Sequence, residues 1–316
     1  MNYEEFKRML ENELKMHLPS DYMNAEIRFD TLNKLGNSYE AMTVRKPGQS
    51  AVAAMNVTQF YKEYMEMPIK GWILDKMADA IIENENITFN NADLTKYEAV
   101  KDRLFIRLSN AEYNENLLKT VPHKIVEDLA VTYHIQIQGP AQDGLYSTIV
   151  NNTLLEQFGV TADQLHEDAM NNSPRLFPPT LRTMREVLMG CGVLPDEPGS
   201  PKMYVLSNPE NINGAAALMY ENAMEEAAKV LDGDYVVLPS SVHELILLPD
   251  NGSLDYNELQ KTVVEVNNNI VKQEDKLSDH VYKYDAVNHQ FSMINTSQQS
   301  FDLRQKEDQL MLIDFS

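Results

Sequence analysis

The chain has 316 residues, which is enough for two or three domains of ordinary size, and its 43% hydrophobic residues argue against wholesale disorder. Its net charge of −21 is uneven, because residues 151–316 hold 26 Asp+Glu against 11 Lys+Arg. This charge disfavours direct binding to nucleic-acid phosphates, which requires a basic surface. It favours another protein as the partner, in particular a basic one, although acidic surfaces commonly serve solubility alone.

The start of the chain and its apolar runs indicate where the protein works. Charged residues are scattered through residues 1–18, whereas a secretory signal requires an uninterrupted apolar run. No run approaches the roughly 18 apolar residues of a membrane span. The single cysteine, Cys191, permits no internal disulfide. We therefore expect a cytoplasmic protein that makes no contact with a membrane.

Residues 1–121 are predicted to form an N-terminal α+β lobe. An opening helix with one buried face is predicted by apolar residues at spacings of three and four, namely Phe6, Met9, Leu10 and Leu14. Trp72, the only tryptophan, falls on the apolar face of a later helix, so we expect it in the core. The other expected elements are a hairpin over 25–31 and 38–45, helices over 57–65 and 72–81, a strand over 103–108 and a helix over 111–118.

Residues 122–190 are predicted to form a middle segment of one hairpin and two helices. Alternating apolar and polar residues predict a long strand over 125–137, for which residues 145–150 provide the partner. Thr161 and Gln164 match a capping box, which predicts a helix over 162–171 that ends before Pro174. A second helix is expected over 181–189. The glycine- and proline-rich stretch that follows predicts a linker over 191–202.

Residues 203–295 are predicted to form a C-terminal α+β lobe around two apolar runs, 235–238 and 242–248. Their density of β-branched and aliphatic residues predicts a pair of strands. Asp255 is expected to cap a helix over 255–271. The other expected elements are strands over 203–207, 215–219, 280–284 and 290–294 and a helix over 222–231, followed by a polar tail over 296–316.

Strand pairs that alternate with helices predict the fold class. We expect an α+β fold with mostly antiparallel sheets and helices packed on one face, divided into two or three lobes. No Rossmann crossover follows from this order of elements. The glycine-rich motifs that cradle phosphates, G-x-x-x-x-G-K-[ST] and G-x-G-x-x-G, are absent, which disfavours nucleotide enzymes of those types.

A polar cluster accompanies the apolar runs of the C-terminal lobe. It combines hydroxyls, imidazoles and carboxylates at two strand entrances: Ser240, Ser241, His243, Glu244, Asp279 and His280. Nucleophilic catalysis needs such a hydroxyl, an imidazole within hydrogen-bond reach and an orienting carboxylate. However, Ser241 and His243 lie two residues apart on an expected strand, and the G-x-S-x-G motif is absent. A structural role, in which the serines bind backbone groups at a turn, is the simpler interpretation.

The same cluster offers the ligands of a metal site. Imidazole and carboxylate groups from His243, Glu244, Asp279 and His280 suit zinc or manganese. The H-E-x-x-H spacing is missing, because His243 and Glu244 are followed by three apolar residues. The sequence therefore predicts no catalytic residue, no metal and no cofactor, and it leaves open whether the protein is an enzyme.

Three separated phrases of this sequence resemble a known family. They are NSPRLFPPTLRTM, then VVLPSSVHELILLP, and LSDHVYKYD about thirty residues further on. The chain from about Leu129 to Tyr284 is similar in this way to an uncharacterised bacterial family, known only as a domain of unknown function and often encoded near mobile elements. The resemblance implies a bacterial cytosolic setting and an α+β fold, and it carries over no activity, cofactor or site residue.

Three hypotheses about function remain. The first is a non-catalytic protein that binds another macromolecule through an acidic surface, motivated by the charge asymmetry. The second is a hydrolase or metal-dependent enzyme centred on Ser241, His243, Asp279 and His280. The third is a nucleic-acid mimic that acts on a host defence protein, which requires carboxylates spaced like phosphates.

Overall fold

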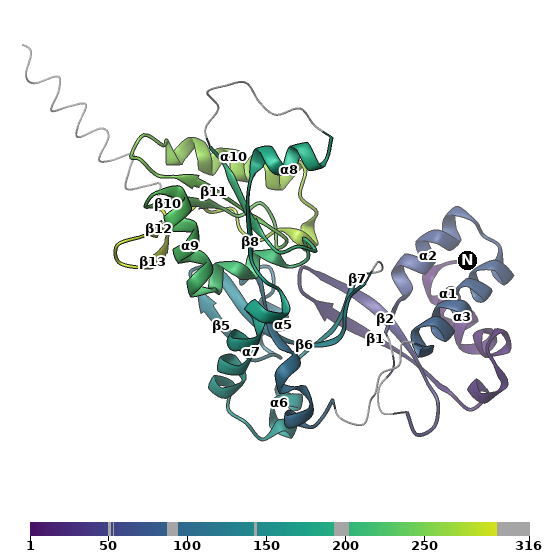
Figure 1. Cartoon of the computed structure of the whole chain (residues 1–316). Coiled ribbons are helices and arrows are strands. Elements are labelled where there is room, and N and C mark those ends of the chain that lie inside the picture. Colours follow the sequence, from purple (N-terminus) through teal and green to yellow (C-terminus); the bar gives the residue numbers. More distant parts are fainter. Residues whose placement is uncertain (50–51, 53, 87–93, 142–143, 193–201, 296–316) are drawn as a thin grey trace, which may run out of the picture. The chain divides into compact units, whose positions relative to one another are not determined.

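The computed structural model describes residues 1–49, 52, 54–86, 94–141, 144–192 and 202–295. The chain forms two compact units, unit 1 over Met1–Lys96 and unit 2 from Tyr97 onward (Figure 1). Most of the expected linker over 191–202 and the whole tail over 296–316 lie outside the described residues.

Unit 1 combines helices with one small antiparallel sheet, in the order β1-β2-β3. Asn2 and Glu5 form a capping box at the start of the first helix, which satisfies backbone donors there. The expected hairpin is confirmed, with Glu26 opposite Arg45 and Lys34 opposite Asn37. The elements are α1 (Tyr3–Glu13), η1 (Leu14–His17), η2 (Ser20–Tyr22), β1 (Glu26–Lys34), β2 (Asn37–Arg45), β3 (Met55–Asn56), α2 (Val57–Glu66) and α3 (Lys70–Asn86).

The core of unit 1 gathers the apolar faces of its helices against the hairpin. The prediction for the opening helix is confirmed, because Phe6 and Leu10 are fully buried beside Met42 of β2 and Met77 of α3. Trp72 packs at the edge of this core and is half-buried. Unit 1 therefore has a hydrophobic core of its own.

The first half of unit 2 is a four-stranded sheet with helices around it. Strands pair in the order β4-β6-β5, and β7 also pairs with β6. Residues 104–118, expected in the first lobe, belong here because β4 pairs along β6 from Leu104 opposite Ile135 to Asn110 opposite Leu129. The elements are α4 (Tyr97–Val100), η4 (Lys101–Arg103), β4 (Leu104–Asn110), α5 (Glu115–Leu118), β5 (His123–Val126), β6 (Leu129–Ala141), β7 (Gly144–Ile149), α6 (Asn152–Phe158) and α7 (Ala162–Leu176).

The second half of unit 2 is a six-stranded sheet in the order β13-β12-β10-β11-β9-β8. All of its pairs are antiparallel, which confirms the expected α+β class with antiparallel sheets. The elements are β8 (Thr180–Thr183), α8 (Met184–Gly190), β9 (Tyr204–Ser207), η5 (Gly214–Met219), α9 (Glu221–Leu231), β10 (Tyr235–Leu238), β11 (Leu245–Pro249), α10 (Tyr256–Asn269), η6 (Gln273–Asp275), β12 (Tyr282–Asp285) and β13 (Gln290–Met293).

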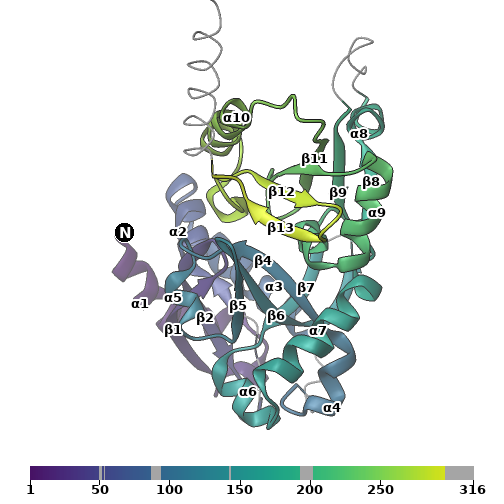
Figure 2. The same ribbon diagram turned by 90° about the vertical axis from the view of Figure 1, so that its left-hand side faces the viewer.

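Helices cover both faces of the six-stranded sheet, where the sequence predicted one face (Figure 2). Val236 of β10 packs in one apolar cluster with Val263 of α10. The preceding residue, Tyr235, donates its hydroxyl to the backbone oxygen of Met224 in α9 at 3.1 Å. Because successive residues of a strand point to opposite faces, α9 and α10 lie on opposite sides of β10.

Two predictions in the middle segment were wrong at turns. The long strand expected over 125–137 is split into β5 and β6, because Glu127 turns the chain in a left-handed conformation with φ 55°. The helix expected to stop before Pro174 runs through it to Leu176. Ser173 holds this turn in place: its hydroxyl donates to the oxygen of Ala169 at 2.5 Å and accepts from the amide of Ile106 at 2.9 Å.

Three further predictions are corrected in the six-stranded sheet. Residues 181–189 begin as strand β8, and the helix starts only at Met184, where Thr183 and Glu186 form a capping box. Residues 215–219 form the 3-10 helix η5 and not a strand, and Ala215 to Leu218 are buried. Strand β11 begins at Leu245, so residues 242–244 belong to the loop before it.

Candidate functional site

Four members of the predicted polar cluster, Ser240, Ser241, His243 and Glu244, lie on the loop between β10 and β11, whereas Asp279 and His280 precede β12. Backbone bonds hold this loop against η6, since the amide of Val242 donates to the oxygen of Asp275 at 2.9 Å. Nδ1 of His243 accepts from the amide of Asn213 at 3.2 Å, which places the ring proton on Nε2. Nε2 lies 3.1 Å from Oδ1 of Asp275 and donates to it. Both ring nitrogens therefore have partners.

Close packing of η5 positions the partners of His243. Asn213 adopts a left-handed conformation with φ 55°, which turns the chain into η5. A Cβ at Gly214 would lie only 2.5 Å from the backbone oxygen of His243 and 2.8 Å from Cα of Ser207. Ser207 also donates its hydroxyl to that oxygen of His243 at 2.7 Å. The position therefore requires glycine, and His243 is held through both its ring and its backbone.

The remaining predicted residues do not assemble around His243. The Ser241 hydroxyl accepts from the amide of His243 at 3.0 Å, so it caps a turn. Asp279 has different partners: its Oδ1 accepts from Asn267 at 2.7 Å and its Oδ2 from Tyr113 at 3.2 Å. The other members occupy the surface, with Ser240 and Glu244 half-buried and His280 exposed. The structure thus joins His243 to Asp275, a residue that the sequence did not single out.

The charge of Asp275 acts on the guanidinium of Arg107 in β4. The sequence did not single out Arg107 either. Its Nε is buried without a hydrogen-bond partner, and no ion pair is formed by its guanidinium among the described residues. Burial lowers the pKa of Arg107 to about 10, and the negative charge of Asp275 opposes this shift. Nearby His134 is fully buried, and burial together with the charge of Arg107 keeps its pKa well below the usual range. This imidazole is therefore neutral.

A carboxylate bridges the two sheets of unit 2. Asp128, in the turn between β5 and β6, accepts from the hydroxyl of Tyr282 at 2.5 Å and from that of Ser278 at 2.7 Å. Burial and the charge of Asp128 raise the pKa of Tyr282, so its hydroxyl stays protonated and donates. These contacts join β12 to the four-stranded sheet. The polar groups at this junction therefore serve the structure of unit 2.

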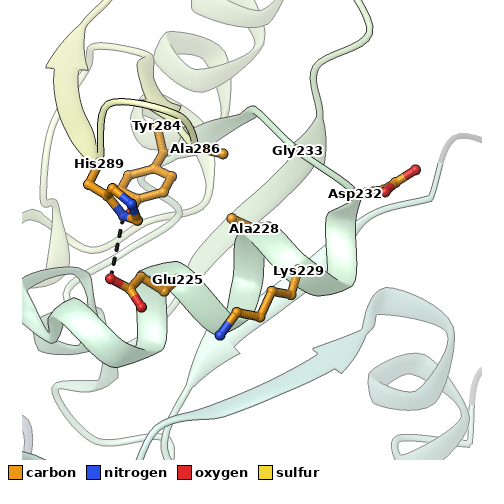
Figure 3. Close-up of a pocket in the computed structure, with 8 residues that line it drawn as sticks. All are labelled: Glu225, Ala228, Lys229, Asp232, Gly233, Tyr284, Ala286 and His289. Atoms are coloured by element: carbon orange, nitrogen blue, oxygen red, sulfur yellow. Dashed lines mark hydrogen bonds and ion pairs between the residues drawn. The ribbon is translucent and has the colours of Figure 1, made fainter.

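A pocket of about 370 Å³ opens between α9 and the loop that joins β12 to β13, and we call it the α9 pocket (Figure 3). Nδ1 of His289 lies 3.4 Å from Oε1 of Glu225 and 3.3 Å from the hydroxyl of Tyr284. His289 has a left-handed backbone with φ 52°. The pocket is lined by Glu225, Ala228, Lys229, Asp232, Gly233, Tyr284, Ala286 and His289.

Three carboxylates act on the hydroxyl of Tyr284, which lines the α9 pocket. Tyr284 stacks on Tyr235 with ring centroids 5.1 Å apart, which fixes the orientation of its ring. Burial raises the pKa of the Tyr284 hydroxyl, and the negative charges of Glu225, Glu221 and Asp285 raise it further. Helix α9 and the loop between β12 and β13 are far apart in the sequence. No local sequence pattern therefore predicts this pocket.

Two other features, a metal site and a membrane-spanning helix, are absent from the residues that the structure describes. No three His, Cys, Asp or Glu side chains in this part of the chain come together as metal ligands. None of its helices combines the length and the apolar character that crossing a membrane requires.

The fold and the site define an α+β protein in which His243 is held by structural contacts and an acidic pocket lies beside α9. The chain belongs to a family of unknown function, DUF5688, whose model matches residues 3–286. This confirms the resemblance to a family without an assigned activity, while its bacterial setting and link to mobile elements stay predictions. No curated protein and no solved structure matches the chain.

Proposed function

We propose that this chain is a non-catalytic protein of the bacterial cytoplasm that binds a basic macromolecule, in particular another protein, through the acidic surface of its C-terminal lobe. The charge distribution carries this proposal: residues 203–295 hold 15 Asp+Glu against five Lys and no Arg, a net charge of −10. Charge complementarity of this kind guides association and selects partners of opposite charge.

Helix α9 presents several exposed carboxylates of this surface. Glu221, Glu226 and Asp232 are exposed on it or at its end, with Lys229 as its single basic residue. On α10, by comparison, Glu258 already forms an ion pair with Lys261 at 2.7 Å. We therefore centre the proposed interface on α9.

The geometry around His243 supports a non-catalytic protein over the hydrolase. A general base needs a free ring nitrogen within reach of a hydroxyl. Both nitrogens of His243 have partners, and the Ser241 hydroxyl contacts the backbone amide of His243 and not its ring. Asp279 is bound to Asn267 and Tyr113. Ser241, His243 and Asp279 thus have separate structural roles, and His280 is exposed.

Capture of a partner by the full chain tests this proposal. A bacterial lysate is passed over immobilised protein at about 50 mM and about 500 mM salt, because screening weakens exposed charge pairs over this range. We expect basic proteins that are retained only at low salt and lost on Glu221→Gln with Glu226→Gln. The matched control, Glu4→Gln with Glu11→Gln on α1, removes the same charge from unit 1 and is expected to retain them.

Two outcomes would count against this function. One is the absence of any salt-sensitive partner, and the other is an equal loss of the partner in the α1 control. If DNA displaces the partner from the α9 surface, the same surface acts as a nucleic-acid mimic, as in the third hypothesis.

A further inference from the structure

We infer that the α9 pocket binds the cationic end of an arginine or lysine side chain, and so anchors the basic partner that the proposed function requires. The choice of a basic side chain as the ligand rests on the proposed function, which is the binding of a basic macromolecule. The pocket itself is an independent feature, since its volume of about 370 Å³ is ample for one long side chain.

The walls of the pocket carry the chemistry that a cation needs. Tyr284 is only 4% exposed and its ring stacks on Tyr235, so the group that it offers is its hydroxyl, which lies beside His289 and can accept a hydrogen bond from an ammonium or guanidinium group. Glu225 supplies a half-buried carboxylate next to that ring. Glu221 and Asp285 add negative charge near the Tyr284 hydroxyl. A carboxylate beside a hydroxyl is complementary to a positive charge on an apolar stem, because both oxygens accept hydrogen bonds.

Small residues leave the room that the ligand occupies. Ala228 of α9 faces Ala286 of the loop across the pocket, and Gly233 contributes no side chain (Figure 3). Lys229 also lines the pocket, but its ammonium points away from the Tyr284 ring (Figure 3). The methylene groups of a lysine or arginine would therefore lie against alanine while their charged end meets Glu225.

His289 contacts the carboxylate of Glu225 across the pocket. The contact between its Nδ1 and Oε1 of Glu225 is long, at 3.4 Å, and the imidazole is more than half exposed. The two side chains approach each other from opposite walls, His289 from the loop and Glu225 from α9 (Figure 3). A guanidinium donates two parallel bonds to a carboxylate and so replaces the single weak contact to His289.

Titration of short peptides into the full chain tests this site directly. The probes are glycine-flanked peptides with one central arginine, lysine or citrulline, where citrulline keeps the shape of arginine without its charge. Binding is followed by the chemical shifts of the α9 and β12–β13 amides. We expect the arginine and lysine peptides to shift these amides and the citrulline peptide to leave them unchanged.

Two variants separate the pocket from the general acidity of the lobe. Glu225→Gln is expected to weaken the arginine peptide about tenfold, and Ala228→Met, which fills the pocket without changing charge, to abolish its binding. Glu265→Gln removes the same charge from the exposed surface of α10 and is expected to change the affinity less than about twofold. An intact circular dichroism spectrum shows that each variant folds.

The results also separate this inference from the proposed function. Equal weakening by Glu225→Gln and Glu265→Gln, or binding of the citrulline peptide, would overturn the pocket as a cation site. If Ala228→Met leaves a salt-sensitive macromolecular partner bound, the acidic surface stands and the pocket inference fails. If the arginine peptide binds but no macromolecular partner does, the pocket stands and the proposed function fails.

Discussion

Replacing Arg107 by methionine is expected to stabilise unit 2, although it removes a charged side chain. The Nε of Arg107 is buried without a partner, and burial lowers its pKa to about 10. This pKa lies below the ordinary value of an arginine because burial penalises the charge, which destabilises the charged form by an amount on the order of 3 kcal/mol relative to water. The residue as a whole is partly exposed. We therefore expect Arg107→Met to raise the free energy of unfolding by about 1–2 kcal/mol.

Urea unfolding of the full chain measures this change, and the single tryptophan provides an internal control. Trp72 packs at the core of unit 1, so its fluorescence follows that unit and is expected to be unchanged. Far-ultraviolet circular dichroism follows the helices and strands of both units, so the transition that it shows beyond the Trp72 transition reports on unit 2. Arg107→Lys keeps the charge and is expected to give no stabilisation. A lower unfolding midpoint for Arg107→Met than for the unaltered chain would refute the reasoning and show that the guanidinium makes a favourable contact.

Three other predictions concern unit 2. Gly214→Ala should lower the free energy of unfolding of unit 2 by about 2–4 kcal/mol, because the added Cβ would clash with backbone atoms. Urea unfolding measures this loss, and an unchanged unfolding midpoint would contradict the prediction. Asp128→Asn should cost about 1–3 kcal/mol by weakening the bonds from Tyr282 and Ser278, which the same assay measures. Burial alone would raise the pKa of Asp250, but bonds from Tyr256 and Lys283 lower it overall, so its stabilisation is present above about pH 4 and is lost as the pH falls further. Asp250→Asn should flatten the dependence of stability on pH below about pH 4, and an unchanged slope would contradict this.

Elements with a strong local signal were predictable from the sequence. The apolar runs of β10 and β11 are buried strands because β-branched and aliphatic side chains fit a covered sheet. Asp255 caps α10 as expected, accepting from the amides of Asn257 and Glu258. These predictions succeeded because residues within one turn or one strand determine the outcome.

Elements that depend on distant contacts were not predictable. The run of small apolar residues in η5 fits a strand equally well, and only the close approach of Gly214 to Ser207 and His243 selects the tighter helix. Pro174 stays inside α7 because Ser173 ties that turn to the amide of Ile106 in β4. Neither partner is visible in the local sequence.

The candidate site shows the same division between local and distant signals. His243 stood out because it interrupts an apolar run, but its partner Asp275 follows α10 within a charged stretch and carries no motif. The α9 pocket joins Glu225 to His289 across two separate elements. Residue types indicated the chemistry that was available, and the tertiary fold decided which groups met.

Cross-linking tests the proposed acidic interface most directly. A reagent that couples carboxylates to amines is added to the full chain with its captured partner, and the joined peptides are identified by mass spectrometry. The account predicts that lysines of the partner are coupled to carboxylates on and beside α9, such as Glu221, Glu225 and Glu226. Coupling that falls mainly on unit 1, with the carboxylates of α9 unmodified, would contradict it.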